Sequence, residues 1–377
     1  MHWTAPCARG TTDLAAAECR SLGLRLTGER LDAVTFEGDW PDAARALVHL
    51  RIPSRLILDL ASFDARSADE LYDGMSNIAW EQWLDARATF AVFASGDLTD
   101  GLRTHVFVAL RTKDAIADRL TRRHGRRPDV AREDPDVRVV VRGRRGHWHV
   151  GLDVAHPPLH ERGFRVAQTE APLKETLAAT VAMAAGWRPD HGPLIDPMCG
   201  SGTLIIEAVN LALGLAPGCT RRFSCERWPH HGARCHALLD AERARAVAHA
   251  RRLFAAPPPM RVEASDLDPN AVLATRKNLA AAGLIDLVTV STADARTRPL
   301  PIATTLLCNP PYGERMGGED VVSLYRDLGI AWRRGDRLRA WVLDGHEQFA
   351  ATFGHAPAAT RPLRNGRLAV NLRQYVF

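Results

Sequence analysis

The chain has 377 residues, 46% of them hydrophobic and 25% charged, which is the composition of a globular protein with two or three domains. No apolar run approaches the roughly 20 residues of a membrane-spanning helix, and no basic region followed by a hydrophobic segment opens the sequence, so we expect neither a membrane protein nor a secreted one. The formal net charge of +5 is carried mostly by arginine, so only local clusters of arginine bear on the choice of partner.

Residues 1–62 predict a ferredoxin-like domain. Strand-forming runs alternate with two helical patterns, the first of which is rich in alanine and closes at Gly23. The order is strand, helix, strand, strand, helix, strand, which is the ferredoxin-like pattern. The expected strands cover 2–5, 24–27, 33–37 and 55–60, and the expected helices cover 11–22 and 41–50.

Residues 63–158 form a second predicted unit. Its expected elements are a helix over 67–84, strands over 90–94 and 105–110, a helix over 114–124, and a hairpin of 137–141 with 147–154. The hairpin turns through a basic segment that holds Arg142, Arg144 and Arg145. Clustered arginines suit nucleic-acid phosphates, although a charge run is often only a solvated face, and nearby acidic residues dilute this one.

A linker over 159–171 leads to a helix expected from residue 172, then to a strand that ends at Asp196 and a loop with Gly200 and Gly202. The glycines let the backbone approach a ligand closely, and the helix that opens near Thr203 presents free N–H groups. Ile205 stands where a dinucleotide fingerprint has its third glycine, and the lysine of a P-loop is missing. The loop therefore favours a ligand without pyrophosphate, such as S-adenosylmethionine.

Strands and helices alternate through the rest of the chain. The expected strands cover 260–265, 287–291, 304–308 and 340–343, the expected helices cover 269–283 and 320–334, and a final hairpin joins 359–363 to 368–377. Asp268 is expected to cap the first of these helices, with Pro269 at its first position, and Asn365-Gly366 signals the hairpin. The order predicts an α/β fold with a parallel sheet and an antiparallel edge.

The strand over 304–308 runs directly into Asn309, Pro310, Pro311 and Tyr312. The prolines fix the backbone and lack N–H donors, so the loop cannot continue the sheet and its carbonyls point outward. The Asn309 side-chain oxygen and the Pro310 carbonyl can accept both protons of an exocyclic amine, and Tyr312 offers a ring face for stacking. Alone, such a segment is as often a rigid turn, but about 110 residues after the glycine loop it indicates methylation of an amine.

Several segments together carry a resemblance to a known family. They are Asp196-Pro-Met-Cys-Gly-Ser-Gly-Thr203, Asn309-Pro-Pro-Tyr-Gly-Glu-Arg315, Leu159-His-Glu-Arg-Gly-Phe-Arg165, Glu170-Ala-Pro-Leu-Lys-Glu-Thr176 and, at the start, Cys7-Ala-Arg-Gly10. Over nearly all its length the chain resembles the 23S rRNA (guanine-N2)-methyltransferases that carry a THUMP domain ahead of a Rossmann-like class I methyltransferase domain. The resemblance makes 63–158 the RNA-binding THUMP domain and 159–377 the methyltransferase domain. Some members carry a further methyltransferase domain at the carboxyl end, and we expect none here.

Ligands of open α/β sheets bind at the carboxyl ends of the strands, which gathers the expected site residues in one crevice. A carboxylate that ends the second strand can accept both ribose hydroxyls, and the resemblance gives this role to Asp266. It also implies that Asp294 faces the adenine amino group and that Gly200 and Gly202 pass under the methionine moiety. We expect Asn309 to act by positioning an aniline-like amine for direct displacement, so no separate base and no histidine dyad is assigned.

The expected site residues fall into three groups. The catalytic group is Asn309, Pro310, Pro311 and Tyr312. The group expected to bind S-adenosylmethionine is Asp196, Met198, Cys199, Gly200, Ser201, Gly202, Thr203, Asp266, Leu267 and Asp294. The group expected to bind RNA is Arg142, Arg144, Arg145, His160, Arg162 and Arg165.

The segment over 215–259 is longer than an ordinary connection between a helix and a strand. It raises the question of a zinc site, because it contains Cys219, Cys225, His230, His231, Cys235 and His236. A Cys-x-x-Cys spacing is missing, so no metal is expected. The resemblance favours a helical insert that borders the substrate cleft.

Three classes of function compete. We favour an RNA guanine-N2 methyltransferase acting on 23S rRNA, with tRNA as the alternative substrate, since THUMP-linked relatives with an Asn-Leu-Pro-Phe type motif act on tRNA. An adenine-N6 methyltransferase shares Asn-Pro-Pro-Tyr, but on DNA it needs a target-recognition domain for base flipping where this chain has its first 165 residues. The intact glycine loop and Asn309 argue against a non-catalytic ribosome-assembly factor. We expect RNA as partner, no obligate protein partner, and a cytoplasmic location, since seven cysteines without framework spacing fit a reducing compartment.

Overall fold

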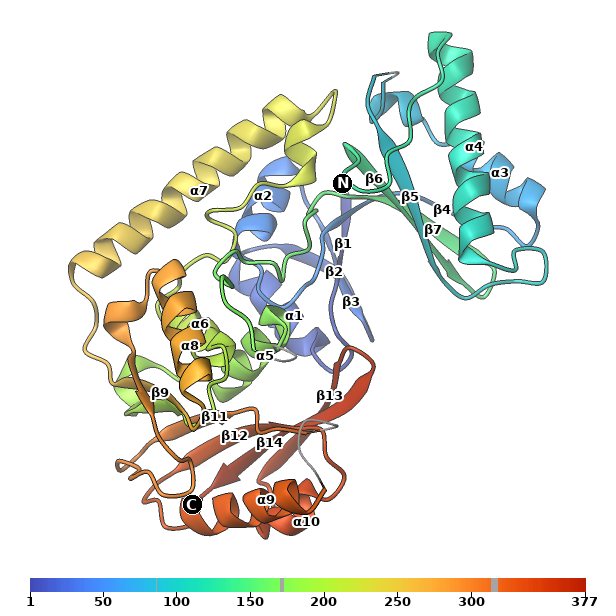
Figure 1. Cartoon of the computed structure of the whole chain (residues 1–377). Helices are drawn as coiled ribbons and strands as arrows, with labels where there is room; N and C mark the ends of the chain where they lie inside the picture. Colours follow the sequence, from blue (N-terminus) through green and yellow to red (C-terminus); the bar gives the residue numbers. More distant parts are fainter. Residues whose placement is uncertain (86, 170–172, 313–317) are drawn as a thin grey trace.

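The computed structural model describes the whole chain except residues 86, 170–172 and 313–317. Its described strands form two seven-stranded sheets, one in each half of the chain (Figure 1). No helix in the described ranges is both long and apolar enough to cross a membrane.

The first half begins with the predicted ferredoxin-like pattern. Its strands are β1 (His2–Pro6), β2 (Arg25–Arg30), β3 (Ala33–Glu37) and β4 (Ile57–Asp64), and its helices are α1 (Thr12–Ser21) and α2 (Trp40–His49). This order confirms the prediction. Helix α2 begins at a capping box, in which the Asp39 backbone N–H donates to the Asp42 carboxylate at 2.9 Å.

The second unit follows directly. It consists of α3 (Ala68–Ser76), a short turn η1 (Trp80–Gln82), β5 (Phe90–Gly96), α4 (His105–His124), β6 (Val137–Arg144) and β7 (His147–Asp153). Helix α3 and η1 replace the single helix expected over 67–84. The β6–β7 hairpin turns at Arg145 and Gly146, which both have positive φ (52° and 84°), so its strands continue through Arg142 and Arg144, further than predicted.

The strand predicted over 105–110 is wrong, because these residues form the first turns of α4. Thr104 caps the helix by accepting a hydrogen bond from the Phe107 backbone N–H at 3.1 Å. Burial then follows helical spacing through Val108, Thr112 and Ala115. Capping and tertiary packing therefore override the β-propensity of the Val-Phe-Val segment.

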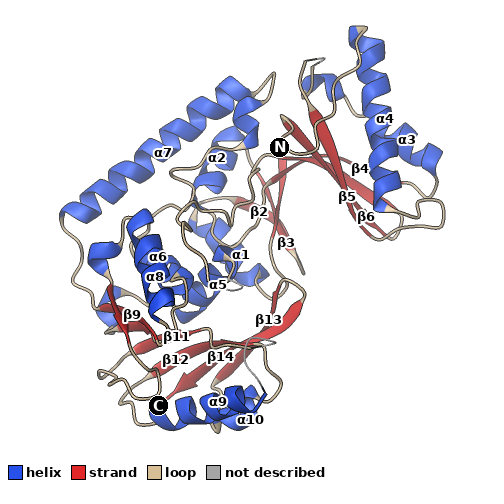
Figure 2. Cartoon of the chain, in the orientation of Figure 1, coloured by secondary structure: helices blue, strands red, loops and turns tan. Residues whose placement is uncertain are grey.

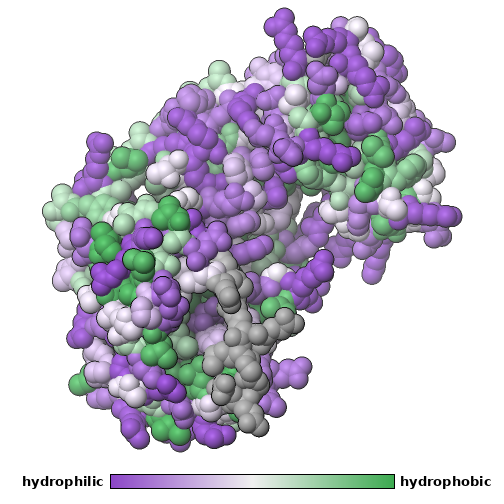
Figure 3. Space-filling view, viewed as in Figure 1, coloured by the Kyte–Doolittle hydropathy of each residue, from purple (hydrophilic) through white to green (hydrophobic). Residues whose placement is uncertain are grey.

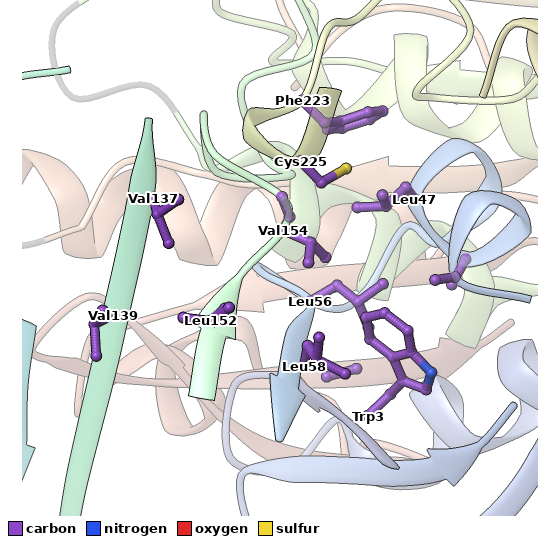
Figure 4. Close-up of a cluster of buried hydrophobic side chains, with 14 of the residues drawn as sticks. Trp3, Leu47, Leu56, Leu58, Val137, Val139, Leu152, Val154, Phe223 and Cys225 are labelled. Carbon is purple, nitrogen blue, oxygen red and sulfur yellow. The ribbon is translucent and has the colours of Figure 1, made fainter. Parts of the chain in front are cut away.

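The two units share a single sheet, in the order β2-β3-β1-β4-β7-β6-β5. Strand β4 pairs with β1 on one side and with β7 on the other, so it belongs to both units. One hydrophobic core runs under this sheet and continues into the second half of the chain (Figure 4). The sheet contributes Trp3, Leu58 and Leu152 to this core, and the second half of the chain contributes Phe223 and Cys225.

The second half has the predicted α/β fold, with the sheet order β10-β9-β8-β11-β12-β14-β13. Its strands are β8 (Leu194–Asp196), β9 (Val262–Asp266), β10 (Thr289–Thr292), β11 (Thr305–Cys308), β12 (Arg339–Asp344), β13 (Ala359–Asn365) and β14 (Leu368–Val376). Its helices near the sheet are α5 (Glu175–Ala185), α6 (Thr203–Ala212), α8 (Pro269–Ala281), α9 (Gly318–Trp332) and α10 (Phe349–Phe353). The first five strands pair in parallel and β14 pairs antiparallel with both neighbours, which confirms the predicted antiparallel edge.

Helices cover both faces of this second sheet (Figure 2). Alternate residues of β11 serve the two faces: Leu306 and Cys308 pack with Tyr325 and Leu328 of α9, and Leu307 joins the core on the other face. Because the covered faces are filled with side chains, the open region lies at the carboxyl ends of β8, β9 and β11, where ligands of such sheets bind.

The insert is helical, as expected. It contains a short turn η3 (Ser224–Arg227) and the long helix α7 (Gly232–Ala255), which packs against α2. Trp228 meets Trp40 edge to face at 6.0 Å between ring centroids, and His231 lies 4.8 Å from the Trp83 ring. The insert therefore attaches the second half of the chain to α2 and to the residues that follow η1.

Buried charges also join the two halves. The Glu207 carboxylate on α6 accepts a hydrogen bond from Arg162 Nε at 3.0 Å, and Arg51 Nη1 lies 3.9 Å from its other oxygen. These side chains are 1%, 3% and 7% exposed, respectively. Arg51 also donates to the carbonyls of Asn210 and Leu215, and Arg162 Nη2 donates to the Arg51 carbonyl at 2.8 Å. We call Arg51, Arg162 and Glu207 the junction cluster.

Glu207→Ala leaves two buried guanidinium groups without their carboxylate, so we expect the free energy of unfolding to fall by ~3–5 kcal/mol. Chemical denaturation followed by tryptophan fluorescence measures this change. Arg188→Ala, which removes an exposed ion pair with Asp190, is the matched control and should leave the transition where it is. A Glu207→Ala transition that coincides with the wild-type curve would show that the cluster does not stabilise the junction.

Candidate active site

A cavity of about 570 Å³ lies at the carboxyl ends of β8, β9 and β11. Residues from three separate predicted motifs meet there. The predicted site residues that line it are Asp196, Met198, Cys199, Gly200, Ser201, Thr203, Asp266, Asn309 and Pro311. The fold thus brings the glycine loop and the Asn-Pro-Pro segment to one place, as the sequence predicts.

The glycine loop between β8 and α6 has left-handed backbone at Gly200 (φ 54°) and Gly202 (φ 81°). A Cβ atom at Gly202 would lie 3.0 Å from the Thr275 side chain, so this position is also closely packed. Thr275 Oγ1 donates to the Gly200 carbonyl at 2.9 Å and holds the loop against α8. The backbone N–H groups at the start of α6 remain near the cavity, where Thr203 lines it.

Asp196 is the buried acid of the site. One of its oxygens accepts the Met198 backbone N–H at 3.2 Å, and the other has no hydrogen-bond partner within the described part of the chain. Burial raises the pKa of Asp196 to about 8, and the nearby Asp266 carboxylate acts in the same direction. An unpartnered carboxylate oxygen in a cavity fits a cationic ligand group such as an ammonium.

Asp266 ends β9 and lines the same cavity. Its Oδ2 accepts the Gly200 backbone N–H at 2.9 Å, and its Oδ1 accepts the Asp268 backbone N–H at 3.1 Å. Each oxygen keeps a second lone pair for a ligand hydroxyl. Asp268 caps α8, as predicted, through the Asn270 backbone N–H at 2.9 Å, and both of these residues also line the cavity.

Three residues expected to bind the cofactor, Gly202, Leu267 and Asp294, lie outside the cavity lining. Leu267 is 63% exposed. Asp294 is held by Arg296, whose Nη2 donates to Asp294 Oδ2 at 2.6 Å, and this guanidinium lowers the pKa of Asp294. An adenine contact at Asp294 therefore requires Arg296 to share the carboxylate.

The Asn-Pro-Pro-Tyr segment forms the other wall. Asn309 Oδ1 is buried and has no hydrogen-bond partner within the described residues. The Pro311 carbonyl accepts the Tyr325 hydroxyl at 2.6 Å, which fixes the loop on α9, and Pro310 is buried behind the lining. Residues 313–315, which complete the motif of the resemblance, lie outside the described residues.

Tyr312 is more enclosed than the sequence suggests. It is only 4% exposed, its hydroxyl accepts the Asn365 Nδ2–H at 3.0 Å, and its ring packs so closely on Gly345 that a Cβ there would lie 2.7 Å from it. It is not among the residues that line the cavity. Its stacking on a base therefore stays a prediction.

Sequence reasoning missed two buried polar residues of α8, Thr275 and Asn278. Asn278 Oδ1 accepts the backbone N–H groups of Val166 and Ala167, each at 2.9 Å. Its Nδ2 donates to the carbonyls of Ser201 at 2.8 Å and Ala167 at 2.9 Å. Asn278 thus joins the linker to the glycine loop. Polar residues on the buried face of a predicted amphipathic helix are the signal that could have identified both residues.

Two of the predicted RNA-binding arginines are corrected by the structure. Arg162 belongs to the buried junction cluster, and Arg165 Nε donates to Glu175 at 3.0 Å while its Nη2 donates to the Leu173 carbonyl at 2.6 Å. Their side chains are 3% and 14% exposed, so in this structure they serve the fold and are not presented to phosphates.

The other predicted RNA contacts remain accessible. Arg144 and Arg145 are exposed on the hairpin, and Arg142 is exposed but pairs with Asp32. His160 is half-buried, and burial lowers its pKa.

The cysteines and histidines of the insert do not gather into a metal site among the described residues. The group that does approach ligand spacing is Glu226, His236 and Asp240. Arg222 and Arg243 donate to the Glu226 and Asp240 carboxylates of this group, so its negative charge is already balanced. The cavity lining contains no residue of the insert.

Family models match three stretches of the chain. The model described as "RMKL-like, methyltransferase domain" matches residues 162–374, "THUMP domain" matches 65–153, and "RlmL ferredoxin-like domain" matches 2–57. A curated relative from Pseudomonas putida, named ribosomal RNA large subunit methyltransferase K/L, is 39% identical over 361 residues, which are 93% of this chain and 47% of the relative. The chain therefore spans about half the length of the curated relatives it matches.

Solved structures share the architecture of the whole chain. A protein from Clostridium difficile 630 described as a "possible methylase" superposes with a TM-score of 0.90 at 27% identity, covering 99% of this chain and 97% of that one. SMU.472, solved in complex with SAH, superposes with a TM-score of 0.89 at 29% identity and the same coverage of both chains.

The raised pKa of Asp196 predicts a pH effect on stability. Between about pH 4 and about pH 8 the folded protein keeps a proton that the unfolded carboxyl has lost, so this group lowers the stability of the ligand-free protein as pH rises. Asp196→Asn removes the titration, and we expect the thermal midpoint of the variant, relative to wild type, to rise from pH 5 to pH 8 in calorimetric scans. The exposed Asp190→Asn is the control. A difference between Asp196→Asn and wild type that stays constant with pH would contradict the assignment.

Proposed function

Because the chain belongs to the RMKL-like methyltransferase family, with an RlmL ferredoxin-like domain and a THUMP domain ahead of the methyltransferase domain, we propose that it transfers a methyl group from S-adenosylmethionine to the exocyclic N2 amine of a guanine in 23S rRNA. The name of the Pseudomonas relative supports a large-subunit ribosomal RNA substrate, and the SAH complex of SMU.472 supports the cofactor. We place the domain boundaries after residues 62 and 158, with 159–171 as the linker.

The observation that carries the proposal is a pair of buried acceptors in one cavity, neither of which has a hydrogen-bond donor among the described residues. Asp196 Oδ2 lies on the glycine-loop side and Asn309 Oδ1 on the Asn-Pro-Pro side. Buried acceptors without a donor are costly, so the cavity is suited to a ligand that brings donors to both. The ammonium group of S-adenosylmethionine and the amine of a nucleobase are such donors.

The residues of the cofactor wall contact different parts of S-adenosylmethionine. Asp196 accepts a hydrogen bond from the ammonium group, and Asp266 accepts hydrogen bonds from the ribose hydroxyls. Gly200 and Gly202 let the backbone approach the methionine moiety closely. When bound, S-adenosylmethionine supplies an electrophilic methyl carbon on its sulfonium. The lining side chains of Met198, Cys199, Ser201 and Thr203 complete this wall of the cavity.

On the opposite wall Asn309 orients the acceptor. Its Oδ1 accepts a hydrogen bond from one N–H of the amine. This bond directs the nitrogen lone pair into the cavity and toward the cofactor wall. The Tyr325 hydroxyl holds the Pro311 carbonyl and keeps this loop in place. Catalysis on this account is mainly positioning, and no histidine or other side chain is needed as a strong base.

Asn309→Ala removes the amine acceptor, so we expect single-turnover methylation to slow by at least ~10²-fold while cofactor affinity stays within a few-fold. Rapid-quench assays and calorimetry measure the two quantities. Asp266→Ala is the comparison variant, and it should weaken cofactor binding first, because the ribose hydroxyls and the Gly200 N–H lose their acceptor. Equal loss of rate and cofactor affinity in Asn309→Ala would make Asn309 a structural residue.

The substrate is tested with total RNA from a strain that lacks the gene. We expect label from S-adenosylmethionine to enter 23S rRNA and to be recovered as N2-methylguanosine after nucleoside separation. Label confined to tRNA would identify a tRNA enzyme, and N6-methyladenosine would identify an adenine enzyme. Either result would overturn the proposed substrate, and an inactive protein that still binds RNA would favour an assembly role.

A further inference from the structure

A second hollow, of about 680 Å³, lies where the two halves of the chain meet. Its walls come from the loop after β1, the linker, the start of α5 and the turn between β13 and β14. The β13–β14 end lies beside the ferredoxin-like domain (Figure 1), where Arg361 forms a two-pronged ion pair with Asp13. We call this hollow the junction groove.

The charge of the junction groove is positive. Arg9, Lys174 and Arg364 line it, are exposed, and form no ion pair with any described residue. The single acidic residue of the described lining, Asp32, is paired with Arg142, and the remaining cation, Arg55, is paired with the buried Asp153. Within the described part of the chain, three cations of the groove therefore have no acidic partner.

The groove continues toward the THUMP hairpin. A neighbouring hollow of about 770 Å³ shares Arg9 and Asp32 with it and is lined further along by Arg30, Arg142 and Arg144. Its lining also contains the acidic residues Asp13, Glu29 and Asp97, of which Asp13 pairs with Arg361 and Glu29 with Arg20. Hydrophilic side chains border the indentation between the THUMP lobe and the rest of the molecule (Figure 3). Arginine side chains thus extend from the hairpin of the first sheet to the edge of the second, and most of the acidic residues among them are already paired with arginines.

The other end of the junction groove contacts the Asn309–Tyr312 segment through Tyr312, which lies outside the lining of the active-site cavity. Asn365, which lines the groove next to Arg364, donates its Nδ2–H to the Tyr312 hydroxyl at 3.0 Å. Tyr312 follows Asn309 and the two prolines on the acceptor wall of the cavity. The β13–β14 end of the groove therefore lies beside the Asn309–Tyr312 segment.

We propose that the junction groove binds the phosphate backbone of a single-stranded RNA segment next to the target nucleotide and leads it from the THUMP hairpin to the Asn309–Tyr312 loop. This rests on the proposed function. Arg9, Lys174 and Arg364 each contact a phosphate, and phosphate contacts of this kind fix the register of a strand without reading its sequence. A single strand suits the groove, because the target base has to leave any helix to enter the cavity.

The test compares two triple variants. Arg9→Ala/Lys174→Ala/Arg364→Ala removes the groove cations, and Arg251→Ala/Arg252→Ala/Arg334→Ala removes three exposed arginines that do not line the groove. Binding of a fluorescent guanine-containing 20-mer RNA is measured over a range of salt. Because the groove variant has no side chain to neutralise three of the phosphates, we expect its slope of log affinity against log salt to become shallower by about 2. The control variant should keep the wild-type slope, and both should bind S-adenosylmethionine as wild type does.

An unchanged salt slope in the groove variant overturns the proposal. So does displacement of the RNA from wild type by polyglutamate as readily as by unlabelled RNA, since the groove would then accept any polyanion. If wild type forms no N2-methylguanosine but the slope still falls in the groove variant, the groove proposal stands and the proposed function fails. If wild type forms N2-methylguanosine and the slope does not change in the groove variant, the groove proposal fails and the proposed function stands.

Discussion

The carboxylate of Glu207, buried between the guanidinium groups of Arg51 and Arg162, is the interaction on which the arrangement of the molecule depends. Arg51 belongs to the ferredoxin-like domain, Arg162 to the linker, and Glu207 to α6, the helix that begins at the glycine loop. In a low-dielectric interior none of the three charges can lose its partners cheaply. The first half of the chain therefore cannot move away from the cofactor loop without separating buried charges.

Rigid attachment matters because the two ligands are held by different parts of the chain. The proposed RNA contacts lie on the hairpin and in the junction groove, whereas the proposed cofactor contacts lie on β8 and β9 and the loop between β8 and α6. Asn278 makes a second connection between these parts. Its side-chain amide accepts a hydrogen bond from the Val166 backbone N–H in the linker and donates one to the Ser201 carbonyl in the glycine loop. A target amine can be placed against a methyl donor only if these surfaces keep their relative positions, and positioning is the main catalytic contribution that the cavity offers.

Much of the fold follows from local signals in the sequence. Asp268 with Pro269, the glycine loop and the Asn365-Gly366 pair act within a few residues, and each lies where the sequence predicts. The strand expected over 105–110 failed because its apolar residues are mostly exposed on α4, where Val106 is 67% exposed, and only tertiary packing decides which face is buried. The RNA contact predicted for Arg162 was wrong for a related reason. An arginine in a linker has the same sequence pattern whether it binds an RNA phosphate or the buried Glu207. Thr275 and Asn278 were missed because their partners are backbone groups at least 70 residues away in the chain.

The most direct measurement of the central claim, that the cavity receives an exocyclic amine, uses inosine. Inosine lacks only the N2 amine of guanosine, so an RNA in which inosine replaces the target guanosine keeps the phosphates and the ring but gives Asn309 Oδ1 no donor from that position. Methyl transfer to the two RNAs is compared at equal occupancy of the protein. The account predicts that both RNAs bind with similar affinity and salt dependence and that only the guanosine RNA is methylated. Methylation of the inosine RNA at the same rate as the guanosine RNA would contradict the claim that the cavity receives the N2 amine.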